Sequence, residues 1–321
     1  MNNQQIDRRT FLKSVASASV AFLFAGTLPL GKRLLADPGA TTGSMATRPI
    51  PSSGEELPVI GLGTWQQFDV DSDPALLRPL VEVLRNLIST GGSVIDTSPM
   101  YGRAEQVIGQ LLSENNWHHQ SFLATKVWTR GRQSAVAQLN DSMDKMNSEQ
   151  IDLVQVHNLV DWQTHLPLLR EWKEEGKIRY HGITHYTRSA FDDLAYVMKN
   201  EDLDFVQLPY SIDMRNAENN LLPLAEERGM AVIVNRPFGA GRLFRSVQYE
   251  PLPDFAREWG IESWAQYFLK FILAHPAVTC VIPGTSNPHH MAENTRAGIG
   301  MIPGESQAKQ MVEYWQEVSS S

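Results

Sequence analysis

From about residue 55 onward, short apolar runs alternate with longer stretches in which apolar residues recur at helical spacing. Each short run holds about four to seven apolar or β-branched residues and ends in polar, Gly or Pro residues, as buried strands do. The eight runs cover residues 58–64, 93–98, 122–128, 152–158, 177–186, 204–211, 231–238 and 279–285. They predict eight strands, each followed by a helix.

Two of the intervening stretches show the helical period clearly. Residues 135–146 place Val136, Leu139 and Met143 on one face, and residues 264–276 carry a stripe of Trp264, Tyr267, Phe268 and Phe271. Eight βα units in about 265 residues match the size and order of a (β/α)₈ barrel with a parallel sheet buried on both faces. An open doubly wound sheet is the alternative, but "GLGTW" at residues 61–65 lacks the third glycine of the dinucleotide fingerprint. We therefore expect an α/β fold, a single (β/α)₈ TIM-barrel domain over residues 55–321.

The first 36 residues have a different pattern. Arg8 and Arg9 precede a weakly apolar stretch over residues 14–30, and small residues follow around Ala36. These features predict a twin-arginine (Tat) signal peptide over residues 1–36, the Tat export machinery as a partner, and a periplasmic or otherwise exported location. The stretch is too short and too rich in Ser, Ala and Gly for a stable membrane anchor, and whether it is cleaved stays open. Residues 37–54 have a loop composition and predict a flexible linker.

Composition narrows the classes of partner. The chain has 321 residues, of which 42% are hydrophobic and 20% charged, as in a globular protein. Its formal net charge is −8, and it becomes −12 without residues 1–36, which hold five basic residues and one acidic residue. An acidic body argues against nucleic acid as a partner. Cys280 is the only cysteine, so an internal disulfide is excluded.

Ionisable residues stand where three consecutive predicted strands end. The second strand gives Asp96 and then Tyr101, the third gives Lys126, and the fourth gives His157. Each alone is weak evidence, since such residues also serve as caps, solvated charges or satisfied polar groups. Barrel strands bring their carboxyl ends to one mouth, however, where active sites lie. A lysine lowers the pKa of a neighbouring phenol and a carboxylate holds the lysine, so this cluster suits proton donation to a carbonyl oxygen.

The motifs around these residues resemble those of the aldo-keto reductase family. "VIDTSPMYG" at residues 94–102 is similar to its Asp-Thr then Tyr-Gly pattern, "LATKVW" at 123–128 to its lysine strand, and "DLVQVHN" at 152–158 to its histidine strand. "GKIRYHGITHY" and "VIPGTSNPHHMAEN" resemble later segments in the same order. The resemblance implies an NAD(P)H-dependent oxidoreductase, most often monomeric, that reduces an aldehyde or ketone. It makes Tyr101 the proton donor, tuned by Lys126 and Asp96, with His157 orienting the small-molecule carbonyl substrate.

The resemblance also implies where the dinucleotide binds. Gly63, Thr64 and Trp65 lie in the family's first cofactor loop, and Thr184, His185 and Gln207 at its nicotinamide carboxamide site. The further implied cofactor residues are Asn235, Arg236, Pro237 and Phe238 after the seventh strand and, at the adenosine phosphate, Pro283, Gly284, Thr285, Ser286, Asn287, His290, Glu293 and Asn294. Trp65 and Trp128 are expected to wall the substrate cleft, with ordinary packing at the barrel end as the alternative.

Three departures from the family pattern bear on the cofactor. Thr184-His185 replaces the usual Ser-Asn, and Asn235 replaces the aromatic residue that often stacks on the nicotinamide. Gly284-Thr285 and His290 stand where relatives often have Lys-Ser and Arg around the 2′-phosphate. NADP(H) is therefore expected, with NAD(H) possible. Arg242 or Arg245 can replace the missing lysine, or both are solvated loop charges.

Export suggests a second function class. An exported module that holds NADP, senses redox state and turns over little is the alternative to a reductase. Asn235 separates the two functions, because loss of the aromatic residue that stacks on the nicotinamide can alter hydride transfer. A metal site is not expected, because His289 and His290 point apart on a helix. The sequence does not give the substrate, and Trp162 either enters the cleft or packs on the following helix.

Overall fold

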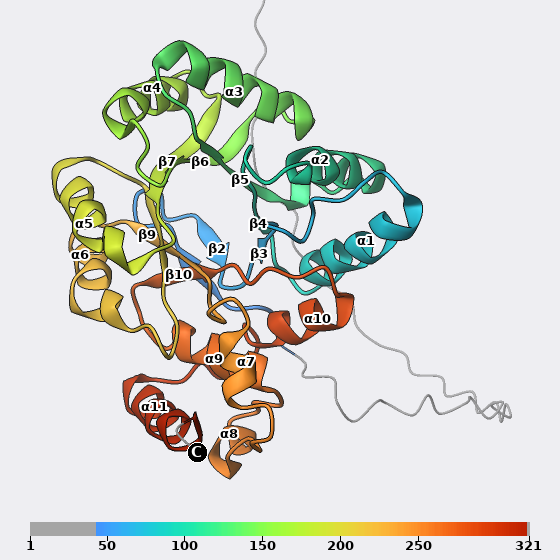
Figure 1. The fold of residues 1–321 in the computed structure, drawn as a ribbon, viewed down its shortest axis with the longest axis vertical. Coiled ribbons are helices and arrows are strands. Elements are labelled where there is room, and N and C mark those ends of the chain that lie inside the picture. The colour runs from blue at the N-terminus through green and yellow to red at the C-terminus, as the bar shows by residue number, and fades with distance from the viewer. Residues whose placement is uncertain (1–42, 320–321) are drawn as a thin grey trace, which may run out of the picture. The chain divides into compact units, whose positions relative to one another are not determined.

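Eight parallel strands follow one another around a ring in the computed structural model, which describes residues 43–319 (Figure 1). The strands are β3 (Leu62–Gly63), β4 (Val94–Asp96), β5 (Phe122–Val127), β6 (Ile151–His157), β7 (Ile178–Thr184), β8 (Phe205–Pro209), β9 (Ala231–Asn235) and β10 (Val278–Val281). Parallel bridges from Ile60 to Val281 and from Gly63 to Gly284 join the last strand to the first. Each predicted run overlaps one of these strands, so the predicted (β/α)₈ barrel is confirmed. The expected export signal and residues 37–42 of the expected linker lie outside the described residues.

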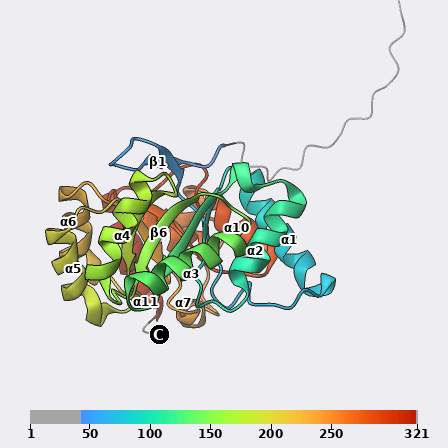
Figure 2. The same ribbon diagram turned by 90° about the horizontal axis from the view of Figure 1, so that it is seen from above.

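Helices follow each strand and surround the ring (Figures 1 and 2). They are α1 (Pro74–Ser89), α2 (Ala104–Asn115), α3 (Arg132–Lys145), α4 (Trp162–Glu174), α5 (Phe191–Asn200), α6 (Leu221–Glu227), α7 (Arg242–Ser246), α8 (Asp254–Glu258), α9 (Trp264–Leu273), α10 (Pro288–Arg296) and α11 (Glu305–Ser319), with 3₁₀ turns η1 (His118–Gln120), η2 (Arg188–Ala190) and η3 (Asn216–Asn219). Within residues 43–319, the helices are too short or too polar to cross a bilayer.

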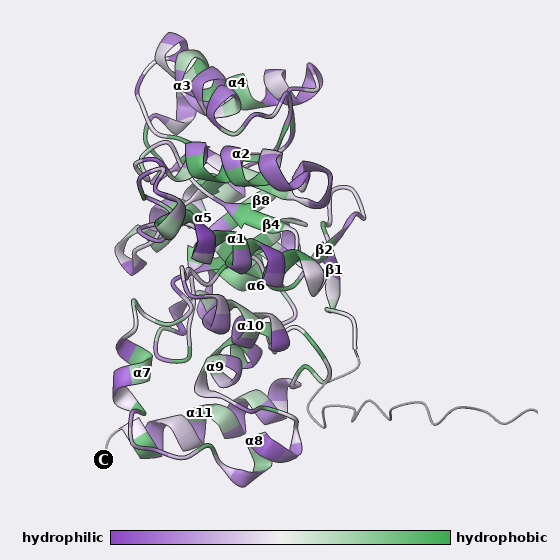
Figure 3. Ribbon diagram, turned by 90° about the vertical axis from the view of Figure 1, so that its right-hand side faces the viewer, coloured by the Kyte–Doolittle hydropathy of each residue, from purple (hydrophilic) through white to green (hydrophobic). Residues whose placement is uncertain are grey.

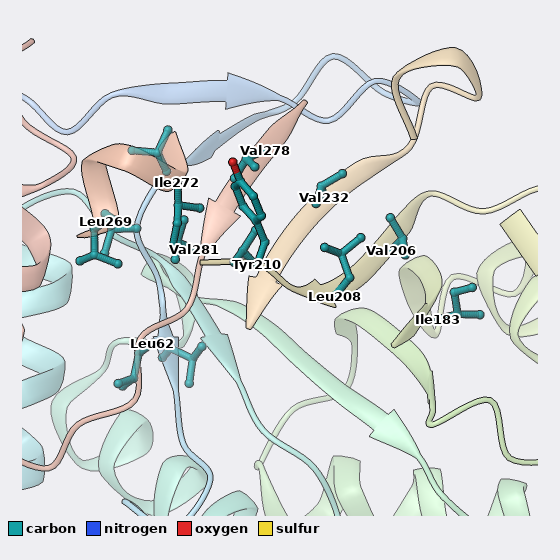
Figure 4. Packing of buried hydrophobic residues seen from close by; sticks show 14 of the residues in the cluster. Leu62, Ile183, Val206, Leu208, Tyr210, Val232, Leu269, Ile272, Val278 and Val281 are labelled. Carbon is teal, nitrogen blue, oxygen red and sulfur yellow. The ribbon is translucent and has the colours of Figure 1, made fainter. Parts of the chain in front are cut away.

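The helices bury one face against the outside of the strands. Figure 3 shows apolar strands at the centre and helices whose polar residues face outward. Outward-pointing strand residues such as Ile183, Val206 and Val232 belong to this layer, together with Leu269 and Ile272 of α9 (Figure 4). α9 is buried on nearly all sides, and the Tyr267 hydroxyl donates to the Met311 carbonyl of α11 at 2.8 Å. The burial extends beyond the predicted stripe of Trp264, Tyr267, Phe268 and Phe271, since Leu269, Ile272 and Leu273 are buried as well.

Inward-pointing residues form layers that change from apolar to polar along the barrel axis. The lower layers are apolar and comprise Val94, Phe122, Ala124, Leu153, Tyr180, Phe205, Ala231, Ile233, Cys280 and Ile282. Because strand side chains alternate, the next inward positions are Asp96, Lys126, Gln155 with His157, Thr184, Gln207 and Asn235. The polar residues of the predicted site are therefore the top layers of a packed barrel interior.

The expected linker over residues 37–54 is wrong for its described end. β1 (Thr47–Pro49) pairs antiparallel with β2 (Glu56–Pro58), and this hairpin lies at the opposite end of the barrel from α7 (Figure 2). Ile50 is fully buried among the apolar interior residues. Arg48 donates to the Leu273, His275 and Val278 carbonyls, which lie at the end of α9 and the start of β10. The hairpin thus plugs the barrel bottom.

Candidate active site

A buried ion pair lies at the top of the barrel interior. Lys126 on β5 is fully buried, and its Nζ donates to Asp96 Oδ2 and to the Thr97 carbonyl, both at 2.6 Å. Burial alone would lower the pKa of Lys126, but the charges and hydrogen bonds of Asp96 and Tyr101 together raise it. The lysine therefore stays protonated in a site that excludes water.

Two amide side chains donate hydrogen bonds to the second carboxylate oxygen of Asp96. Gln155 Nε2 donates to Oδ1 at 3.3 Å and Gln207 Nε2 donates to it at 2.8 Å. Gln207 Oε1 accepts from Thr184 Oγ1 at 3.0 Å and from Asn235 Nδ2 at 3.2 Å. A hydrogen-bonded chain thus crosses the barrel from β5 to β9. Sequence reasoning missed Gln155, although this polar residue stands two positions before His157 on the same strand face.

Tyr101 follows β4 and turns back over this pair. Lys126 Nζ lies 5.0 Å from the centroid of the Tyr101 ring. Burial raises the pKa of the phenol above its ordinary value, and the Lys126 charge opposes that rise without cancelling it. The expectation of a lowered pKa is therefore wrong in direction for this structure. A raised pKa means that the phenol carries its proton at neutral pH.

His157 lies beside the phenol at the end of β6. The two rings meet edge to face, with centroids 5.9 Å apart and planes at 85°. Burial, with the Lys126 and His185 charges in second place, lowers the pKa of His157 to about 3, so the imidazole is neutral at physiological pH. His157 Nδ1 is 3.2 Å from Ser98 Oγ. Ser98 was not among the predicted site residues, although it directly follows the Asp-Thr pair.

Several exposed apolar side chains follow strands at the carboxyl end of the barrel. Trp65 is 52% exposed and Trp128 is 43% exposed, and both follow strands of the barrel. Neither ring makes a ring–ring contact within the described residues. Met100, Tyr186 and Phe244 are also exposed after β4, β7 and β9. The Trp65 and Trp128 rings are thus accessible at the carboxyl ends of their strands, and their role as walls of a substrate cleft stays a prediction.

A stack of side chains stands after β7. The His185 and Tyr186 rings are 5.5 Å apart at 12°, and the Arg236 guanidinium lies 5.7 Å from the Tyr186 centroid. His185 Nδ1 accepts from the Tyr186 and Thr187 backbone amides at 3.0 and 3.2 Å. Burial lowers the pKa of His185. The His185 ring is thus held as a neutral acceptor by its own turn, beneath an exposed tyrosine.

Two polar atoms next to this stack have no hydrogen-bond partner among the described residues. They are Asn235 Oδ1 and Arg236 Nε, both buried. Arg236 has a φ of 52°, a left-handed conformation that a non-glycine residue adopts at a cost. Arg236 thus combines a left-handed backbone with the absence of an ion-pair partner in the described part of the chain. Pro237 is buried behind it, and the Phe238 ring packs on Phe244 at 4.8 Å.

The loops after β3 and β10 meet at the mouth. A Cβ on Gly63 would lie 2.9 Å from the Ile282 carbonyl oxygen, so only glycine permits this approach. The Thr64 amide and hydroxyl both donate to the Asp96 carbonyl at 3.0 Å, which turns the Thr64 side chain inward. Ser286 Oγ donates to Gln67 Oε1 at 3.1 Å. The predicted cofactor residues of both loops are therefore neighbours.

The loop from β10 leads into the start of α10. Asn287 caps this helix by accepting from the His289 amide at 2.9 Å, and the Thr285 hydroxyl accepts from the Asn287 amide at 3.0 Å. Gly284 and His290 are exposed, whereas Pro283 is buried. The other predicted residues of this segment face the body of the barrel: Glu293 accepts from Gln266 and pairs with Arg296, and Asn294 is buried.

The structure gives the surroundings of Arg242, Arg245 and Trp162, whose roles the sequence left open. Arg242 donates to Asp213 through Nε at 3.0 Å and through a second nitrogen, whereas Arg245 is exposed and makes no ion pair within the described residues. Trp162 packs edge to face on Tyr196 of α5, with centroids 6.4 Å apart, so it lies among the helices. Residues 43–319 contain no group of three metal-ligating side chains.

Comparison with known proteins finds a family model and several similar reductases. A sequence model described as "Aldo/keto reductase family" matches residues 59–309. Methylglyoxal reductase YeaE of Escherichia coli (strain K12) is 27% identical over 258 residues, which cover 78% of this chain and 89% of that protein. The NADH-specific methylglyoxal reductase of the same strain is 26% identical over 310 residues, 78% of this chain and 92% of that protein. An aldo/keto reductase from Klebsiella pneumoniae, solved in complex with NADP and acetate, superposes with a TM-score of 0.70 at 25% identity, covering 82% of this chain and 93% of that one.

Proposed function

Because this chain belongs to the aldo/keto reductase family, we propose that it reduces an aldehyde or ketone to an alcohol with a nicotinamide cofactor, and that Tyr101 gives the proton. The observation that carries the proposal is the assembly of Tyr101, Lys126, Asp96 and His157 at one mouth of the barrel. A redox sensor without turnover would not require a buried lysine–carboxylate pair behind a protonated phenol.

Tyr101 is suited to act as a general acid. Its burial keeps the proton on the phenol until a substrate oxygen develops negative charge. Lys126, held charged by Asp96, then stabilises the phenolate that forms. Gln155 and Gln207 fix the carboxylate, so the charge that supports the reaction is already in place.

His157 is suited to orient the carbonyl oxygen next to Tyr101. It is neutral, so one ring nitrogen carries a proton that can be donated to the oxygen. The exposed Trp65 and Trp128 rings favour an apolar group on the carbonyl carbon. Methylglyoxal is the first small aldehyde to test, since two of the similar proteins bear that name.

The residues present fit a nicotinamide dinucleotide. When bound, the reduced nicotinamide supplies the hydride. Asn235 offers an unpaired amide oxygen of the kind that accepts from a carboxamide, and Arg236 offers a cation without an ion-pair partner within residues 43–319 for the phosphates. Tyr186 presents an exposed aromatic face next to them and can replace the missing stacking residue. His185 and Thr184 are committed to hydrogen bonds within the protein, so their contribution is shape.

The adenosine end would lie at residues 283–287 and the start of α10. Exposed Gly284 and His290 leave room for a 2′-phosphate beside a basic group. On α7, Arg245 is exposed, whereas Arg242 is already paired with Asp213. We propose NADP(H) as the cofactor, with NAD(H) as the alternative. The loss of the family's lysine is consistent with only a modest preference.

A titration with both dinucleotides tests the proposal. Purified protein is titrated with NADPH and separately with NADH while tryptophan fluorescence is followed, and oxidation of the bound dinucleotide is then measured after addition of methylglyoxal or an aromatic aldehyde. Tighter NADPH binding with aldehyde-dependent oxidation supports the proposal. Tighter NADH binding with turnover keeps the reductase and overturns the cofactor. Binding of neither dinucleotide overturns both.

Export by the Tat route is a separate proposal, supported by Arg8 and Arg9 and by the single cysteine. A protein exported after folding can carry its cofactor with it. Fractionation of cells that express the full chain tests this proposal, with an Arg8→Lys, Arg9→Lys variant as the control. Periplasmic protein with wild-type arginines and cytoplasmic protein with lysines is expected, and equal cytoplasmic retention of both would refute export.

A further inference from the structure

Ser98 lies in the turn between Asp96 and Tyr101 and is fully buried. Its Oγ has two hydrogen-bond neighbours among the described residues. The Met100 backbone amide donates to it at 3.4 Å, and His157 Nδ1 lies 3.2 Å away. Because an imidazole nitrogen can donate or accept, the contact with His157 has two chemical meanings.

We propose that Ser98 is a positioning residue that donates its hydroxyl hydrogen to His157 Nδ1 and so holds the imidazole as the tautomer protonated at Nε2. The position of the Ser98 hydroxyl hydrogen decides the tautomer. The Met100 amide is a donor only, so the hydroxyl hydrogen cannot go there. If Nδ1 carried a proton and donated to Oγ, the buried hydroxyl hydrogen would have no acceptor among residues 43–319, at a cost of about 1–3 kcal/mol. Donation to Nδ1 gives both the hydroxyl hydrogen and the Nδ1 lone pair a partner.

The surroundings of His157 keep this arrangement from being lost by protonation. The ionisable groups around the ring are Lys126, Tyr101 and His185, and among them only Lys126 carries a charge at neutral pH. A cation beside the imidazole disfavours a second proton on it. The ring therefore stays neutral. Its single proton can lie on either nitrogen, and the hydrogen bond from Ser98 to Nδ1 favours Nε2.

The consequence deepens the proposed reductase function and rests on it. With Nδ1 occupied by Ser98, Nε2–H is the donor that remains for the substrate oxygen, and the oxygen receives hydrogen bonds from His157 and Tyr101 together. The opposite tautomer would present a lone pair to the oxygen and repel it.

Nuclear magnetic resonance tests the tautomer without reference to activity. The full chain is labelled with ¹⁵N-histidine, the His157 signals are assigned by their loss in a His157→Asn variant, and two-bond ¹H–¹⁵N correlations report which ring nitrogen carries the proton. The wild type is expected to show an unprotonated Nδ1 and a protonated Nε2. Protonation at Nδ1 in the wild type would overturn the proposal outright.

Variants then separate positioning from simple packing. Ser98→Ala is expected to give a mixture of tautomers, and Ser98→Thr, which keeps the hydroxyl, to restore the wild-type pattern. Ser142→Ala removes a buried hydroxyl from α3 and serves as the matched control, with no change at His157. An unchanged His157 tautomer in folded Ser98→Ala would show that a group other than Ser98 determines the tautomer.

A kinetic arm connects the tautomer to the reaction. Ser98→Ala is expected to lower kcat about three- to tenfold, since it weakens a donor that would cost roughly 10²-fold or more if removed outright. Cofactor affinity should stay within about twofold, because Ser98 makes no contact with the proposed dinucleotide site. Tautomer loss with unchanged kcat would separate Ser98 from catalysis. A wild type without activity would refute the proposed function, while the tautomer result would still stand.

Discussion

Replacing Lys126 by methionine tests whether its charge supports the reaction at Tyr101. Methionine keeps the length and apolar character of the lysine stem and removes the ammonium from its 2.6 Å contact with Asp96. Lys126 is fully buried, so solvent cannot replace the lost charge. The substitution therefore changes electrostatics more than shape.

The magnitude follows from the geometry. A unit charge 5.0 Å from the Tyr101 ring centroid stabilises a phenolate by about 3 kcal/mol at the effective dielectric constant of ~20 that suits protein sites. If the full effect reaches the transition state, kcat falls about 10²-fold. Removing one partner of a buried ion pair also destabilises the fold by about 3–5 kcal/mol. The pKa of the Tyr101 phenol should rise further, since the charge that opposes burial is gone.

The assay is a single turnover of enzyme-bound NADPH with excess aldehyde, followed by absorbance, at a temperature where circular dichroism shows the variant folded. Lys173→Met is the matched control. Lys173 also contacts a tyrosine and a carboxylate, with its Nζ 5.8 Å from the Tyr180 centroid and 2.7 Å from Asp204, but it lies outside the site. The control should react at the wild-type rate. A folded Lys126→Met protein that binds NADPH and reacts at the wild-type rate would refute the electrostatic role.

Three further outcomes are expected. The pKa of His157 is lowered to about 3 in the folded state, below its unfolded value of about 6.5, so the unfolded chain takes up the proton first and stability falls as pH drops between these values. Urea titrations should show that this group lowers the free energy of unfolding by about 3 kcal/mol between pH 7 and pH 4. If the free energy of unfolding of the wild type depends on pH no more steeply than that of His157→Gln, the expectation is contradicted. Arg48→Met should lower the free energy of unfolding by about 2–4 kcal/mol, since three carbonyls lose a charged donor, with kcat unchanged; an unchanged melting temperature would refute the plug. Arg236→Met should weaken NADPH binding about tenfold in fluorescence titrations, and an unchanged Kd would remove Arg236 from the phosphate site.

The barrel could be predicted because each strand leaves a clear signal. Parallel strands buried on both faces produce apolar runs, and their polar ends mark the mouth. Asp96, Lys126 and His157 were therefore identifiable by position, and the structure brings them together with Tyr101. Residues whose role depends on the interior layers rather than on the strand ends, such as Gln155, were missed.

The hairpin β1–β2 shows why short elements escape prediction. β1 has three residues, and the hairpin contributes only Ile50 and Leu57 to the apolar interior cluster, so its sequence carries no readable periodicity. Its surroundings are rich in Pro, Ser and Gly, which indicates a loop. The hairpin forms because the barrel bottom offers Ile50 an apolar site and because carbonyls at the end of α9 and the start of β10 accept from Arg48, and both are tertiary effects.

The balance of opposing effects at Tyr101 also lies beyond the sequence. The neighbouring Lys126 was predictable and does act to lower the pKa of the phenol, but the degree of burial that raises it depends on how the turn after β4 folds back. The same turn places Ser98 against His157, a contact between residues 59 positions apart.

Tyr101→Phe tests the central claim most directly. The variant loses one oxygen and keeps the ring that packs against His157, so NADPH should bind within about twofold of the wild-type Kd. Aldehyde reduction should fall by about 10²- to 10⁴-fold, the range expected for loss of a general acid. A Tyr101→Phe protein that binds NADPH and reduces the aldehyde at the wild-type rate would show that the proton comes from elsewhere.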